Sequence, residues 1–195
     1  MNPFLASSQY IDWRDIHVFQ LSIELRRDSA DNIDFVRRAF EWVRDEISHT
    51  GDFELDVVTC AASEVLKHRT GYCYAKSHLL AALCRAQGVP AGLGYQRLSM
   101  NDDGPPFCLH GFAVIQLEGH GWRRLDPRGN KPGITTEFST NNDCLAFTPS
   151  LQGEMTFPEI LPEPLEVVVA ALREYPRRVD FSLHLPDQDR MISVP

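Results

Sequence analysis

The sequence predicts an α+β fold in which a cysteine-bearing helix packs on an antiparallel β-sheet. The first observation is a helical pattern over residues 73–86, where small and apolar side chains recur at the spacing of one helix face. The second is a change to a period of two from Ala91 onward, which is typical of strands. The third is a pair of strand patterns, over residues 109–117 and 122–126, separated by a hairpin-turn signal.

The chain before the cysteine is predicted to be mostly helical. A short helix is expected near residues 17–25, and a cap signal at residues 28–31 precedes a longer amphipathic helix that reaches about Ser48. The apolar stripe of that helix is formed by Ile33, Val36, Phe40, Val43 and Ile47. Next comes an extended piece through Val57 and Val58, and then a short helix over residues 61–68.

Cys73 is predicted to lie in the first turn of the central helix. Gly71 interrupts the pattern just before it, while Gly88 and Pro90 mark the expected end of the helix. Free backbone N–H groups and the positive end of the helix dipole point at a side chain in this position. Such surroundings favour the nucleophilic thiolate, and none of the other four cysteines is placed in this way.

The strands after this helix carry the next two polar residues of interest. His110 lies on the strand over residues 109–117, and residues 119–121 form the expected turn. The return strand ends at Asp126, because Pro127 lacks a backbone donor. From about residue 130 the pattern is harder to interpret: residues 165–172 fit a helix or a strand, and one more strand is predicted over residues 179–183.

Composition narrows the class of protein. The chain has 195 residues and a formal net charge of −8, so the clustered positive charge that nucleic-acid binding needs is missing. The sequence has no apolar run of about 18 residues and starts without a secretory signal pattern, so neither a membrane span nor export is predicted. Five cysteines form an odd count without framework spacing, which is typical of reduced thiols and predicts a cytoplasmic protein.

The domain organisation predicted from the sequence is a single domain over residues 1–195. Its core covers about residues 28–130, preceded by an N-terminal helical segment, 1–27, and followed by a C-terminal extension, 131–195. The length suits one well-packed domain, and we find no internal repeat, low-complexity tract or linker.

Cys73, His110 and Asp126 form a candidate catalytic triad. A cysteine nucleophile needs a base that takes its proton, and the base needs a third group that fixes its orientation. If residues 109–126 form the hairpin, His110 and Asp126 lie at the same end of neighbouring strands. The helix can then present Cys73 to the other nitrogen of the imidazole. The alternatives without catalysis are purely structural roles: a buried cysteine, a core histidine and an aspartate that caps the turn at Pro127.

The order and context of these residues resemble the transglutaminase-like superfamily, a branch of the papain-like cysteine enzymes. The resemblance is strongest to stand-alone bacterial members that are often described as cysteine proteases, and it covers roughly residues 9–150. The matching blocks are residues 10–13, 43–47, 63–73, 79–91, 110–114 and 122–127.

The resemblance implies a papain-like core and a Cys-His-Asp triad at Cys73, His110 and Asp126. It also implies attack on a carboxamide to give a thioester, which water or an amine then resolves. The chain departs from the common pattern at Phe112, where a tryptophan is frequent, and at Arg128, where a small hydroxyl residue often follows Asp-Pro. Both departures are expected to affect which substrate shapes the site accepts. A second oxyanion donor is implied as well, and Trp13 and Trp42 are the indole options, although packing roles suit them better.

The function expected from these observations is a cysteine-dependent amide-processing enzyme, either a peptidase or amidase or a transglutaminase-type acyltransferase. The expected partner is a peptide or protein amide, without nucleic acid or membrane, and the oligomeric state is left open. No cofactor and no metal are expected, because no ligand spacing for zinc or calcium is present. Two alternatives stay open: a catalytically silent papain-like interaction module, and acyl transfer from coenzyme A of the arylamine N-acetyltransferase kind.

Overall fold

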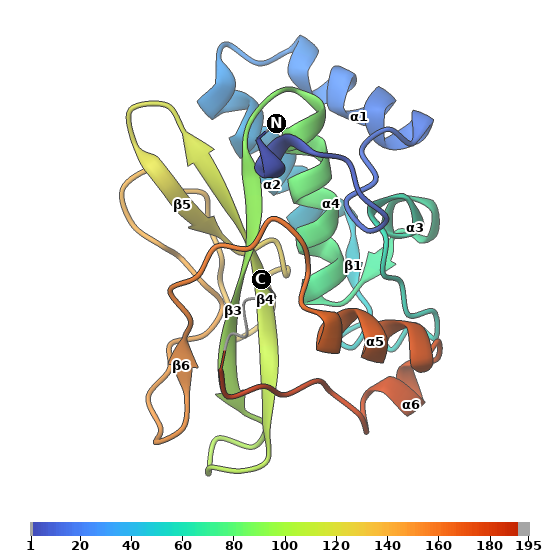
Figure 1. Ribbon diagram of the computed structural model, residues 1–195, viewed down its shortest axis with the longest axis vertical. Helices are drawn as coiled ribbons and strands as arrows, with labels where there is room; N and C mark the ends of the chain where they lie inside the picture. The colour runs from blue at the N-terminus through green and yellow to red at the C-terminus, as the bar shows by residue number, and fades with distance from the viewer. Residues whose placement is uncertain (1, 191–195) are drawn as a thin grey trace.

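The computed structural model describes residues 2–190; residue 1 and residues 191–195, the ends of the predicted N-terminal segment and C-terminal extension, lie outside the described residues (Figure 1). The helices are α1 (Ile16–Arg27), α2 (Asn32–Glu46), α3 (Ala62–His68), α4 (Cys73–Ala86), α5 (Glu166–Glu174) and α6 (Arg178–Phe181), after a 3-10 turn at Pro3–Leu5. The strands are β1 (Ser48–His49), β2 (Thr70–Gly71), β3 (Ala91–Ser99), β4 (Phe107–Leu117), β5 (Gly121–Leu125) and β6 (Met155–Thr156).

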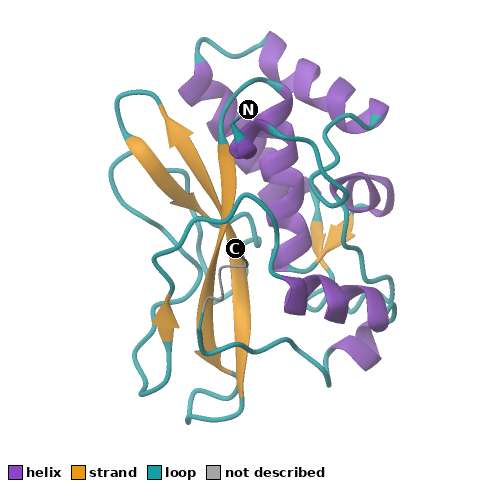
Figure 2. Cartoon of the chain, viewed as in Figure 1, coloured by secondary structure: helices purple, strands orange, loops and turns teal. Residues whose placement is uncertain are grey.

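The main sheet has four strands in the order β5-β4-β3-β6, and all of its pairings are antiparallel. Helix α4 is buried from Cys73 to Arg85 and packs against β3 and β4. Figure 2 shows the helices gathered on one side of this sheet. The α+β fold with the cysteine helix on an antiparallel sheet is therefore confirmed.

The helices before α4 agree with the sequence patterns. Asp15 caps α1 and Asp31 caps α2, each accepting a hydrogen bond from a backbone N–H of the first turn. The predicted apolar stripe of α2 is buried at Val36, Phe40 and Val43, where α2 packs on α4. The expected extended piece near residue 57 forms only an isolated bridge between Val57 and Arg177.

A small parallel sheet joins the end of α2 to the beginning of α4. Ser48 pairs with Thr70, and His49 pairs with Gly71, two residues before the cysteine. The hydroxyl groups of Thr50 and Thr70 lie 2.8 Å apart and are buried, which adds a polar tie between the two segments. This pairing was not predicted, because strands of two residues are too short for a periodic signal.

The C-terminal part of the chain corrects one prediction. The predicted strand over residues 179–183 is wrong, because residues 178–181 form helix α6. The ambiguous stretch at residues 165–172 lies in helix α5. Both helices lie beside the start of α4 (Figure 1), where Phe181 packs against Tyr72 with ring centroids 4.5 Å apart.

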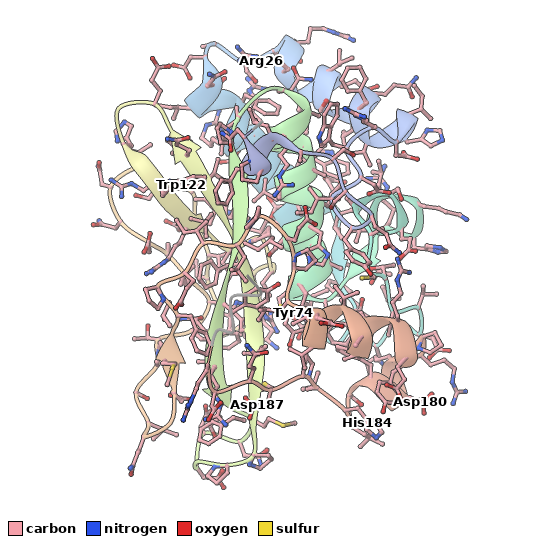
Figure 3. The ribbon with its side chains drawn as sticks, in the orientation of Figure 1. Arg26, Tyr74, Trp122, Asp180, His184 and Asp187 are labelled. Carbon is pink, nitrogen blue, oxygen red and sulfur yellow. The ribbon has the colours of Figure 1, made fainter. Side chains whose placement is uncertain are left out.

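Beyond α6 the chain returns to the main sheet. The backbone N–H of Leu109 donates to the carbonyl of Pro186 at 2.8 Å. Asp187 then pairs with Arg97 of β3 at 2.6 Å, near the end of the sheet where Figure 3 labels it. These contacts support the single domain, which stays a prediction for the chain as a whole. Over the described part of the chain, no helix has the length and apolar character that crossing a membrane requires.

Candidate active site

Cys73 is the first residue of α4, as predicted. Its thiol lies against the edge of β4, where the backbone N–H of Gly111 points at the sulfur with an N···Sγ distance of 3.5 Å. Strand β5 pairs with β4 only as far as Ala113, so the edge before it is open to the helix. Gly111 allows this approach, because a Cβ atom there would lie 2.9 Å from the ring of Tyr74.

His110 and Asp126 are brought together by the β4–β5 hairpin. The Nε2 atom of His110 lies 2.7 Å from Oδ2 of Asp126, and both side chains are buried. The carboxylate also accepts the backbone N–H groups of Ala146 at 2.9 Å and Arg128 at 3.1 Å. Because Nε2 is taken by the carboxylate, Nδ1 is the imidazole nitrogen left for the thiol of Cys73.

The electrostatics of the three groups favour an imidazolium at His110. Burial alone lowers the pKa of His110, but the charges of Asp126 and the Cys73 thiolate, with hydrogen bonds to both, raise that pKa to about 10. Burial likewise raises the pKa of Asp126, but the charge of His110 and the hydrogen bonds to the carboxylate outweigh it and lower that pKa. The carboxylate therefore stays ionised beside a protonated ring at neutral pH.

A cleft of about 440 Å³ opens over Cys73 and His110. Tyr72, Tyr74 and His49 line it, and the C-terminal extension contributes Phe147, Thr148, Ser150 and Glu154. Leu185 lines it as well, so the extension supplies two parts of the lining.

One sequence prediction about the surroundings needs correction. Phe112 does not bear on the shape of the cleft: it is buried over Gly94, outside the cleft lining, whereas Arg128 does line the cleft. Trp13 and Trp42 lie outside the cleft and have the packing roles that the sequence favoured. The indole of Trp13 donates to the carbonyl of Leu5, and that of Trp42 packs under the guanidinium of Arg69.

The remaining cysteines differ from Cys73 in their surroundings. All five are free thiols. Burial raises the pKa of Cys60 and of Cys108 to about 12, and it raises the pKa of Cys84 further still. Cys108 nevertheless lines the cleft, on the same strand as His110. Across residues 2–190, no three His, Cys, Asp or Glu side chains converge closely enough to hold a metal ion.

Three residues of the site were missed by sequence reasoning. His49 enters the cleft through the β1–β2 pairing, across more than twenty residues of sequence. Phe147 packs on His110, and Gln96, which lies opposite His110 in the sheet, donates to the carbonyl of Phe147 at 3.1 Å. Only the alternation of β3 could have placed Gln96 on the face of the histidine, and it does not indicate the contact.

The chain belongs to the transglutaminase-like superfamily, because the family model of that description matches residues 20–127, more than half of the sequence. This range contains Cys73, His110 and Asp126. Membership supports a cysteine-based enzyme activity. No curated protein sequence matches the chain.

Solved structures align with part of the chain. A proposed cysteine protease from Cytophaga hutchinsonii aligns with a TM-score of 0.50 and 22% identity, over 65% of this chain and 41% of that one. The periplasmic domain of TgpA from Pseudomonas aeruginosa aligns with a TM-score of 0.46 and 20% identity, over 64% of this chain and 45% of that one. The chain thus spans less than half the length of either protein.

Proposed function

We propose that the protein is a cysteine-dependent enzyme that processes carboxamides through a thioester intermediate. Cys73 is the nucleophile, His110 the acid and base, and Asp126 the residue that orients the imidazole. The observation that carries the proposal is the 2.7 Å contact between Nε2 of His110 and Asp126, which leaves Nδ1 for the thiol at the start of α4. A silent interaction module would have no need of a buried, fully hydrogen-bonded carboxylate behind a histidine.

In the first half of the reaction, the thiolate of Cys73 attacks the carbonyl carbon of the amide. The carbonyl electrons move to oxygen and give a tetrahedral oxyanion, and the backbone N–H of Cys73 is the natural first donor to it. The C–N bond then breaks as His110 delivers its proton to the departing nitrogen. Ammonia or an amine leaves, and the acyl group remains on the sulfur as a thioester.

In the second half, the now neutral His110 takes a proton from the incoming nucleophile. Water gives a carboxylic acid, which releases its proton to solvent, and an amine gives a new amide; both routes return the thiolate and the imidazolium. We favour hydrolysis, because water is always present whereas transamidation requires a site that selects an amine and excludes water.

The substrate class that we propose is a peptide or protein amide. The cleft has the size of a binding site for a side chain and its neighbouring backbone, and its lining combines apolar with polar groups. Leu98, Leu109 and Leu185 are apolar contacts within it, while Arg128 adds a cation beside the triad. A cytoplasmic location stays a prediction.

A turnover assay tests the proposal. Wild-type protein is incubated with a library of peptide amides and casein, with and without a fluorescent primary amine, and ammonia, new amino termini and amine incorporation are measured. We expect Cys73→Ala to abolish turnover, whereas Cys144→Ala, a half-exposed thiol outside the cleft, should keep it. Full turnover by Cys73→Ala would refute the proposal. Acylation that requires an acyl-coenzyme A donor would favour the N-acetyltransferase alternative instead.

A further inference from the structure

His49 lies in the cleft that holds Cys73 and His110. The parallel pairing of β1 with β2 sets it beside Gly71, and the backbone N–H of Thr50 donates to the carbonyl of Gly71 at 3.2 Å. The ring of His49 then packs edge-on against the ring of Tyr72, with centroids 5.4 Å apart. Tyr72 is the residue just before Cys73, so the histidine is held against the start of α4.

The hydrogen bonds of the His49 ring fix which nitrogen carries the proton. Nδ1 accepts the backbone N–H of Asp52, with an N···N distance of 3.3 Å, so the neutral ring carries its proton on Nε2. Among residues 2–190, no group hydrogen-bonds to Nε2. Nε2 is also accessible to solvent. The buried side-chain nitrogen and oxygen atoms that lack a hydrogen bond all belong to other residues. His49 therefore carries an accessible N–H donor, on a side chain that lines the cleft and also a smaller pocket beside Lys76.

The surroundings of His49 keep it neutral. Burial is the largest cause and the positive charge of Arg128 the next, and together they lower the pKa of His49 to about 3. The carboxylate of Asp52 acts in the opposite direction, but it is engaged by Arg128 at 2.7 Å and by Lys131 at 2.7 Å. A neutral donor of this kind can stabilise a negative oxygen without adding a competing acid to the site.

Two other side chains of the cleft lining make hydrogen bonds within the protein. The hydroxyl of Tyr74 donates to the carbonyl of Leu109, and Nη2 of Arg128 donates to Asp52, whereas Nη1 forms an ion pair with Asp52 without a hydrogen bond. A tetrahedral intermediate needs a second donor besides the N–H of Cys73 to balance the charge on its oxygen. We propose that His49 is this second donor of the oxyanion hole, with Nε2–H directed at the carbonyl oxygen of the substrate. The inference rests on the proposed function, because it assumes acylation of Cys73.

Two reactions of the same thiol separate this role from a structural one. Iodoacetamide alkylates a thiolate by direct displacement and forms no oxyanion, whereas p-nitrophenyl acetate acylates it through a tetrahedral oxyanion. For His49→Ala we expect acylation to fall about 100-fold or more, the range for loss of one oxyanion-hole donor. Alkylation should change by no more than about twofold, because it requires no such donor. His49→Gln should restore part of the acylation rate, because its amide can donate from a similar place.

The control is His17→Gln, which alters an exposed histidine of α1 and should change neither rate. The inference is overturned if His49→Ala acylates normally, or if it loses alkylation and acylation in equal measure. It is also overturned if Tyr72→Phe, rather than His49→Ala, shows the selective loss of acylation. The proposed function fails separately, and this inference with it, if Cys73→Ala keeps the wild-type acylation burst.

Discussion

The ring of Phe147 stands edge-on against the ring of His110, with the two centroids 5.0 Å apart. Phe147 comes from the C-terminal extension, far from the hairpin in sequence. Its carbonyl accepts a hydrogen bond from Gln96, and the preceding residue, Ala146, donates to Asp126. The extension therefore holds both members of the His–Asp pair in place, and the candidate site is not complete without it.

The contact between Phe147 and His110 leads to the first prediction. Phe147→Ala removes an aromatic pair worth about 1 kcal/mol and lets the imidazole move, so turnover should fall about fivefold or more. The control is Phe138→Ala, in the same extension, where the ring packs on Phe40 and not in the cleft. Steady-state kinetics of the two variants would test this, and equal losses would mean that Phe147 acts through stability alone.

The buried carboxylate of Asp126 gives a second prediction. Asp126→Asn replaces an acceptor of three hydrogen bonds, from His110, Ala146 and Arg128, by a group that must also donate. The imidazole would then turn or take the wrong tautomer, and kcat should fall on the order of 10³-fold to 10⁴-fold, as in serine triads. Asp143→Asn, on the surface, should keep kcat within about twofold, the effect of a weak surface ion pair. A loss below tenfold for Asp126→Asn would contradict its orienting role.

The close approach of α4 to β4 gives a third prediction. A Cβ at Gly111 would lie 2.9 Å from Cδ1 and 3.3 Å from the backbone Cα of Tyr74, and the backbone cannot yield as a flexible side chain does. Gly111→Ala should therefore lower the free energy of unfolding by about 1–3 kcal/mol and slow alkylation of Cys73. Denaturant unfolding and iodoacetamide kinetics measure the two effects. An unchanged alkylation rate would show that the helix start tolerates the displacement.

The buried amine of Lys76 gives a prediction on pH. Its Nζ donates to the carbonyls of Ile47 and Arg44 at the end of α2. Burial, followed by the charge of Arg128, lowers the pKa of Lys76 to about 7. Between pH 7 and about 10.4, the reference value for lysine, the unfolded chain then binds more protons than the folded one. Lys76 should therefore add stability as the pH rises through this window.

The pH dependence expected from Lys76 is tested by comparing the free energy of unfolding of wild type with that of Lys76→Met. The free energy of unfolding of wild type, relative to the variant, should increase from pH 7 to pH 10, because groups common to both chains cancel. Lys67→Met, on the exposed face of α3, should show no such trend. A difference that is constant with pH would mean that Lys76 stays protonated in the folded protein up to its usual range.

Local patterns were enough to predict much of the fold. The 3.6-residue period over residues 73–86 and the turn at residues 119–121 predicted α4 and the β4–β5 hairpin. Those two elements are what bring Cys73, His110 and Asp126 together. Each of these inferences needed only neighbours within about twenty residues.

The other parts of the site depend on contacts that have no local signal. His49 reaches the cleft through a two-residue parallel pairing with β2, and Phe147 through one hydrogen bond to Gln96. Residues 179–183 alternate between apolar and polar side chains like a strand. In the structure, however, Phe181 packs against Tyr72 as the last residue of helix α6. Tertiary packing there overrides a weak local preference.

The most direct test of the Cys73–His110 pair is the rate of Cys73 alkylation as a function of pH. Wild type should react rapidly below pH 7, because the imidazolium of His110 lies beside the sulfur there. His110→Ala should slow the reaction below pH 7, and Cys73→Ser should abolish the fast phase. A slow wild-type reaction below pH 7 that is unchanged by His110→Ala would contradict the pair, and with it the proposed chemistry.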